Sequence, residues 1–183
     1  MRDQIMSDFL KALASREASP GGGATAALHV AQAAALVARC AEERDVVAEA
    51  QALSMHALRL AEKDSHAFTT VSRARRLPSG DERALLDARR GACVPPADVI
   101  AAAAVVLDLA ERVPPDPRVV TDIAAAAEAA RAAATTARVS IAVQLAGLPE
   151  DAALRESVAT VGEICERADR VTEAIRSGVA LSR

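Results

Sequence analysis

Apolar residues recur at helical spacing along most of the chain. Ile5, Phe9 and Leu13 share one side of a helix near the start, and a longer apolar stripe runs from Val46 to Val71. Clusters of proline and glycine separate the periodic segments. No segment alternates with the period of a strand, so we predict no sheet. The pattern predicts helices over residues 2–14, 24–41, 44–75, 81–93, 96–112, 121–145 and 150–175.

Short connections between these helices favour an all-α, antiparallel up-and-down helical bundle that forms a single domain over residues 1–183. Pro95-Pro96 either kinks one helix or separates two. Thr121 is a plausible N-cap for the helix that follows it. We expect breaks at residues 15–23 and 77–80, and a turn at 147–149.

Composition narrows the class of protein. About a quarter of the 183 residues are alanine, which predicts closely packed helices. A net charge of -3 and an aromatic content of 1% argue against nucleic-acid binding. The three scattered cysteines match neither a disulfide framework nor a metal site. We expect reduced thiols, a cytoplasmic location, no metal, no signal peptide and no membrane-spanning stretch.

A run of three glycines precedes an alanine-rich helix. Gly21, Gly22 and Gly23 form either a flexible turn that caps the helix or a backbone that a ligand can approach closely. In the second case, free N–H groups at the positive end of the helix would face the ligand. The run lacks the residues of a P-loop and does not follow a predicted strand.

Asp64 interrupts the apolar stripe of the helix predicted over residues 44–75. Steps of three and four from Leu60 reach Asp64 and then Phe68. A carboxylate at this position needs a partner, a proton or a cavity, because burying it unpaired costs several kcal/mol. Asp64 is therefore either a core carboxylate paired with an arginine or an acid/base group in a ligand cleft.

Other polar candidates carry weaker signals. His29 lies one turn or more into the helix after the glycines and could reach a ligand there. Phe68 either fills the core, the interpretation we favour, or packs against a ligand. The arginines near one predicted turn form either a solvated helix end or a contact for an anionic substrate tail; they are Arg73, Arg75, Arg76, Arg89 and Arg90.

Taken together, these features resemble the cyclodeaminase/cyclohydrolase family, which includes formiminotransferase-cyclodeaminase and methenyltetrahydrofolate cyclohydrolases. The resemblance spans nearly the whole chain in order. Its motifs are Phe9-Leu10, Pro20-Gly21-Gly22-Gly23-Ala24, Asp64-Ser65-His66-Ala67-Phe68, Leu77-Pro78, Val94-Pro95 and Thr121-Asp122-Ile123-Ala124-Ala125-Ala126.

The resemblance implies a helical bundle that forms a homodimer and binds a tetrahydrofolate derivative as substrate, with no metal or redox cofactor. It places the active-site aspartate on Asp64 and lines the same cleft with Gly21, Gly22 and Gly23. The implied activity is that of a formimidoyltetrahydrofolate cyclodeaminase or a methenyltetrahydrofolate cyclohydrolase. Both reactions use the same carboxylate, so the sequence leaves both open.

One segment departs from the family pattern. Where relatives carry Asn-Val-x-Ile-Asn, this chain has Arg138-Val139-Ser140-Ile141-Ala142. Arg138 is kept as a candidate substrate contact, but it cannot accept a hydrogen bond as an amide can. The departure motivates a second hypothesis, the same fold acting on a non-folate amidine or imine. A third is a non-catalytic helical module that binds partner helices.

Overall fold

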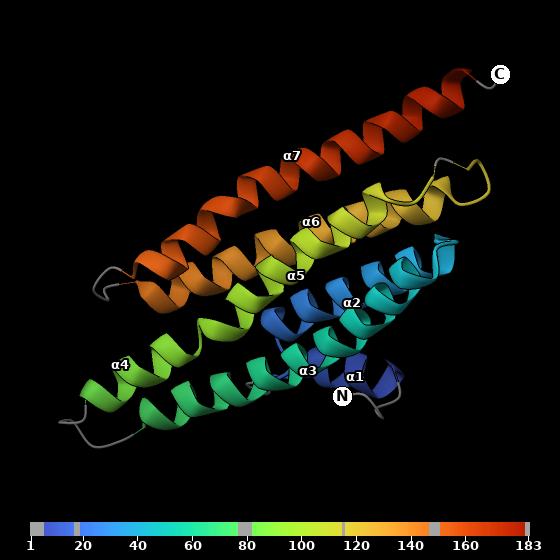
Figure 1. Cartoon of the computed structure of the whole chain (residues 1–183). Coiled ribbons are helices and arrows are strands. Elements are labelled where there is room, and N and C mark those ends of the chain that lie inside the picture. The colour runs from blue at the N-terminus through green and yellow to red at the C-terminus, as the bar shows by residue number, and fades with distance from the viewer. Residues whose placement is uncertain (1–5, 17–18, 77–81, 115, 147–150, 182–183) are drawn as a thin grey trace.

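The structure is a computed structural model of the chain. It describes residues 6–16, 19–76, 82–114, 116–146 and 151–181, and no strand occurs among them. Figure 1 shows a bundle of long helices with both ends of the chain at its periphery. The helices are α1 (Met6–Leu13), α2 (Gly22–Cys40), α3 (Arg44–Ala74), α4 (Glu82–Gly91), α5 (Val94–Glu111), α6 (Val120–Leu145) and α7 (Ala152–Leu181).

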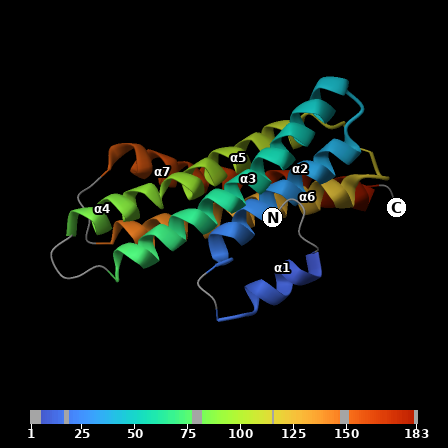
Figure 2. The ribbon, with the colours of Figure 1, turned by 90° about the horizontal axis from the view of Figure 1, so that it is seen from below.

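Neighbouring long helices in the chain run in opposite directions. The Ser54 hydroxyl of α3 donates a 2.9 Å hydrogen bond to the Ala31 carbonyl in the middle of α2. At the end of α2, Arg39 pairs with Asp122 in the first turn of α6, with 3.0 Å between Nε and Oδ2. The short helix α1 lies apart from the long helices in Figure 2. The predicted all-α, up-and-down bundle is therefore confirmed.

Helices α2 and α6 pack against each other, and most of the residues that each of them buries are alanine. Ala27 and Ala34 of α2 and Ala130 and Ala134 of α6 have no exposed surface. Side chains this small let two helices approach closely, which explains the alanine content of both segments. Larger aliphatic side chains complete the core around them; Leu60, Ile100, Leu107, Ile141 and Ile164 are among the largest that are fully buried.

Several helix boundaries differ from the prediction. Helix α2 begins at Gly22, inside the predicted break, and α7 continues to Leu181. The break after α4 falls at residues 92–93, so Pro95 and Pro96 lie in the first turn of α5. Proline fits there because first-turn N–H groups have no partner within the helix.

The remaining boundary predictions concern the start of α6 and two breaks between helices. Val119 holds the N-cap position of α6, so the prediction for Thr121 is wrong. The breaks predicted at 77–80 and 147–149 lie outside the described residues.

The segment Glu82–Glu111 is long and apolar enough to cross a membrane by length and composition alone. Its most apolar 18-residue window has a mean hydropathy of 1.8. Asp98 and Asp108 interrupt this segment, so it is not the uncharged stretch whose absence the sequence predicts. The same window is 61% buried inside the bundle, as in the core helix of a globular protein. Its hydropathy reflects the alanine and valine that pack against the neighbouring helices.

Candidate functional site

The Asp64 carboxylate lies against the first turn of α2. A β-carbon built on Gly23 would overlap the Asp64 carboxyl carbon and both of its oxygens. The backbone N–H of Ala24 donates a hydrogen bond to the same carboxylate. Asp64 lies in the last third of α3, so two separate helices meet at this side chain. The structure brings together the two features that stood out in the sequence.

Burial dominates the electrostatics of Asp64. Desolvation raises the pKa of its carboxyl above the ordinary value, and the hydrogen bond from Ala24 opposes that rise. Both effects are expected for a half-buried carboxylate at the positive end of a helix. No ion pair between described residues involves Asp64. The alternative in which Asp64 is a core carboxylate paired with an arginine is therefore not seen among the described residues.

The three glycines have different surroundings. Gly21 is the N-cap of α2, with extended backbone, and a β-carbon there would meet open space. At Gly22 a β-carbon would lie 3.8 Å from Thr136 Cγ2 of α6, an ordinary contact. Only at Gly23 is the space already occupied, by Asp64. Gly22 is exposed and Gly21 is half-buried, so the backbone that a ligand can reach lies at these two positions and not at the occupied face of Gly23.

Ala24 was not singled out by the sequence analysis, because its contribution is a backbone group. It is the third residue of α2, and N–H groups in a first helical turn have no partner within the helix. The available signal was its position directly after the glycine run. An acceptor had to come from elsewhere in the fold, and that acceptor is Asp64.

His29 and Arg138 lie away from this contact. A helix turns by about 100° per residue, so His29 lies about 120° round α2 from Gly23. Its Nδ1 is buried and has no hydrogen-bond partner in the part of the chain that the structure describes. Arg138 is exposed and follows Thr136 by two residues, so it leaves α6 on the side away from Gly22. Their predicted roles as substrate contacts stay predictions.

Phe68 lies one turn after Asp64 on the same face of α3. It is 39% exposed, so the favoured interpretation that Phe68 fills the core is wrong. Val71, in the next turn, is fully buried, which shows that the apolar stripe continues past Phe68 without covering it. The structure thus leaves an aromatic side chain accessible close to the buried carboxylate.

The amino-acid sequence matches the family model for formiminotransferase-cyclodeaminase over residues 5–163. The chain belongs to this family. A comparison with curated proteins returned no match. Among solved structures, the chain is similar to formiminotetrahydrofolate cyclodeaminase from Thermotoga maritima, with a TM-score of 0.78 and 24% sequence identity. That match covers 95% of this chain and 98% of the other, so the two folds agree over nearly their full length.

Of the five arginines near the predicted turn, one makes hydrogen bonds to another helix and four are exposed. The Arg89 guanidinium donates hydrogen bonds to the Ala146 carbonyl at 2.6 Å and the Val143 carbonyl at 3.4 Å. Both carbonyls lie at the end of α6, where backbone acceptors have no partner within the helix. The four other arginines are exposed on α3 and α4 or just after α3; they are Arg73, Arg75, Arg76 and Arg90.

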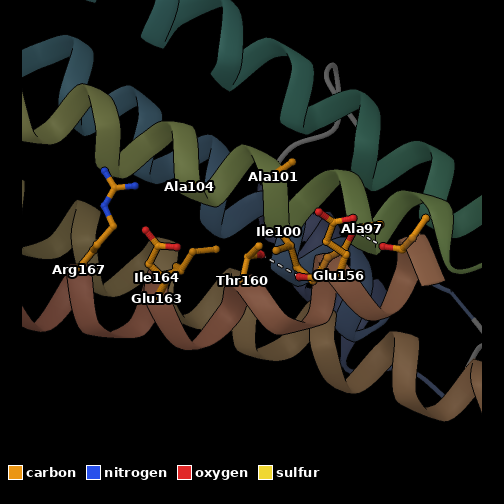
Figure 3. A pocket seen from close by; sticks show the side chains of 11 residues that line it. Ala97, Ile100, Ala101, Ala104, Glu156, Thr160, Glu163, Ile164 and Arg167 are labelled. Carbon is orange, nitrogen blue, oxygen red and sulfur yellow. Dashed lines mark hydrogen bonds between the residues drawn. The ribbon is translucent and has the colours of Figure 1, made fainter. Parts of the chain in front are cut away.

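Hollows lined by described residues also lie along α5 and α7. A groove of about 550 Å³ lies between α5 and α7, with Ala97, Ile100 and Ile164 on its floor and glutamates on its rim (Figure 3). A second, of about 860 Å³, lies where the α5–α6 connection meets α7. Neither is lined by Asp64 or the glycines. Within the described residues, no group of three or more His, Cys, Asp and Glu side chains could hold a metal ion.

Proposed function

We propose that this chain acts on a one-carbon unit carried by reduced folate, as a formimidoyltetrahydrofolate cyclodeaminase or a methenyltetrahydrofolate cyclohydrolase. Membership of the formiminotransferase-cyclodeaminase family supports the substrate class. The observation that carries the proposal is the half-buried Asp64 carboxylate, which meets the first turn of α2 beside Gly23 and has no cationic partner among the described residues.

Both reactions need a group that stabilises a cation and transfers a proton. In cyclodeamination, N10 attacks the formimino carbon on N5, ammonia leaves, and a cationic methenyl bridge remains. In the hydrolysis, water adds to that bridge, the bond to N5 breaks, and 10-formyl folate forms. Asp64 would take the proton from N10 or from water and return it to the departing nitrogen. As a carboxylate in a partly desolvated position, it would also stabilise the cation.

Neighbouring groups supply a surface for the substrate. The exposed Phe68 ring lies one turn from Asp64 and can pack against a flat pterin ring. Gly21 and the exposed Gly22 come directly before Gly23, which contacts the carboxylate. The substrate would then lie across the start of α2, over Asp64, with its ring system toward Phe68.

The non-folate alternative rests on one observation. Arg138 and Ala142 replace both asparagines of the family pattern, and both are exposed on α6. A related amidine or imine that does not need those amides would suit this chain. Reduced folates would then fail to raise its melting temperature. Asp64 has no cationic partner among the described residues, which argues against the third hypothesis, a module with no chemistry, because a half-buried carboxylate without a counterion is costly to keep.

The test is to incubate the protein with formimino- and methenyl-tetrahydrofolate and to follow the methenyl chromophore. Its appearance from the first substrate indicates deamination, and its loss from the second indicates hydrolysis. Asp64→Asn should lower kcat by about 10²–10⁴-fold, the usual contribution of a general acid or base, with circular dichroism unchanged. Asp122→Asn is the matched control and should keep its activity. Equal turnover by both variants would remove Asp64 from the mechanism.

A further inference from the structure

We propose that Gly23 is a positioning residue for Asp64 rather than a substrate contact. The absence of a side chain at Gly23 lets the carboxylate dock on the first turn of α2. The part of this inference that concerns catalysis rests on the proposed function, and the part that concerns geometry does not.

The Asp64 carboxyl group occupies the volume that a β-carbon at Gly23 would need. A substrate therefore cannot reach that face of Gly23 while the carboxylate is in place. A β-carbon at Gly21 would meet open space, and one at Gly22 would make an ordinary contact. A side chain is therefore excluded at only one glycine of the three.

Residue 23 does not need to be glycine for its backbone conformation. Gly23 is the second residue of α2, inside a regular helix, and its φ lies outside the left-handed region that favours glycine. Alanine is the better helix former at such a position. Because nothing in the local backbone requires glycine, the requirement comes from the side chain that docks on it.

Docking on Gly23 holds the Asp64 carboxylate in one position. With Gly23 in place, the carboxylate accepts the Ala24 N–H and is held on a rigid helix end. The contact fixes the side-chain rotamer of Asp64 as well as its solvation. A methyl group at residue 23 would force the short Asp64 side chain to rotate away and lose that hydrogen bond. Misplacing a reacting group by about 1 Å can cost about 100-fold in rate.

The experiment compares Gly23→Ala in two backgrounds, native and Asp64→Ala, where the overlapping atoms are gone. We expect Gly23→Ala to raise the melting temperature, or leave it unchanged, in the Asp64→Ala background, and to change it less favourably in the native background, where the added methyl group overlaps the Asp64 carboxyl. In the native background it should also shift the Asp64 titration seen by NMR. If Gly23→Ala alone fails to fold while the double variant folds, the same coupling is shown. Equal melting shifts in both backgrounds would overturn the proposal.

The activity measurement uses Gly162→Ala as its control. Gly162 is a glycine within α7 where a β-carbon would meet open space. With whichever of the two folates the native protein turns over as substrate, we expect kcat/KM to fall about 100-fold for Gly23→Ala and to stay unchanged for Gly162→Ala. Equal kcat/KM for these two variants would show that Gly23 does not position a catalytic group. If the native protein turns over neither folate, the proposed function fails, and the melting and titration data still decide the geometric part.

Discussion

The Asp64 carboxyl group experiences two opposing influences. Burial disfavours its charged form, and the Ala24 N–H at the start of α2 favours it. Burial is the larger effect, so the pKa of Asp64 is raised. A carboxyl with a raised pKa can hold a proton closer to neutral pH and release it there, which suits an acid/base role.

The raised pKa also predicts how stability depends on pH. The folded chain binds the Asp64 proton more tightly than the unfolded chain does. The resulting stabilisation is fully present below the unfolded pKa, near pH 4, and is lost as pH rises through the folded pKa. Asp64→Asn cannot ionise, so it should be more stable than the native protein at pH 7.

Urea unfolding of both proteins between pH 3.5 and 7.5 checks this prediction. The difference in free energy of unfolding should shrink as the solution is acidified, at about 1.4 kcal/mol for each unit between the folded and unfolded pKa values. A difference of constant size, or a variant less stable at pH 7, would show that burial does not dominate at Asp64.

At the scale of elements, α6 is held by small side chains along its length and by an arginine at its end. Its buried face is mostly alanine, from Ala126 to Ala137, and it packs mainly on α2 and α5. Arg89 of α4 supplies the donors that the last carbonyls of α6 lack. This fixes the end of the helix that carries the segment from Arg138 to Ala142.

Close packing on α6 predicts a strong sensitivity to side-chain size. Ala134 has no exposed surface, so Ala134→Leu must push α6 away from its neighbours. We expect a loss of about 1–3 kcal/mol in the free energy of unfolding, measured by urea titration. Ala125→Leu lies on the exposed side of the same helix and should change little. Similar losses for both substitutions would argue against tight packing along this face.

Across the whole molecule, ion pairs link helices that are distant in sequence. Arg112, the C-cap of α5, pairs with Asp45 and Glu49 of α3, and Arg167 of α7 pairs with Asp108 and Glu111 of α5. Pairs of this kind are worth about 0–1 kcal/mol each where solvent reaches them. These ion pairs favour one axial alignment of the helices, where contacts between alanine faces alone would allow several. The apolar core supplies most of the stability.

We also expect the whole molecule to be a homodimer, as the family resemblance implies. Val139 and Val143 lie one turn apart on α6 with exposures of 59% and 58%, and a second copy could cover them. Light scattering after size exclusion should give a mass of twice 18.9 kDa. A mass of one chain at every concentration tested would contradict the expectation.

The sequence by itself determined the helices and the two anomalies that mark the site. Helical periodicity is a local property, so the range of α3 was predicted to within a residue at its end. Glycine repetition before a helix, and a carboxylate in an apolar stripe, are also visible without any partner helix. The alanine content similarly predicted close packing.

Only the tertiary structure decided what each of these residues contacts. It placed Asp64 on the first turn of α2, left Phe68 exposed, and used Arg89 to cap α6. These outcomes depend on which helix packs against each side chain, and on which turn of that helix lies beside it. Periodicity fixes which face of a helix is apolar, but the partner of a single side chain is set by contacts between residues far apart in the chain.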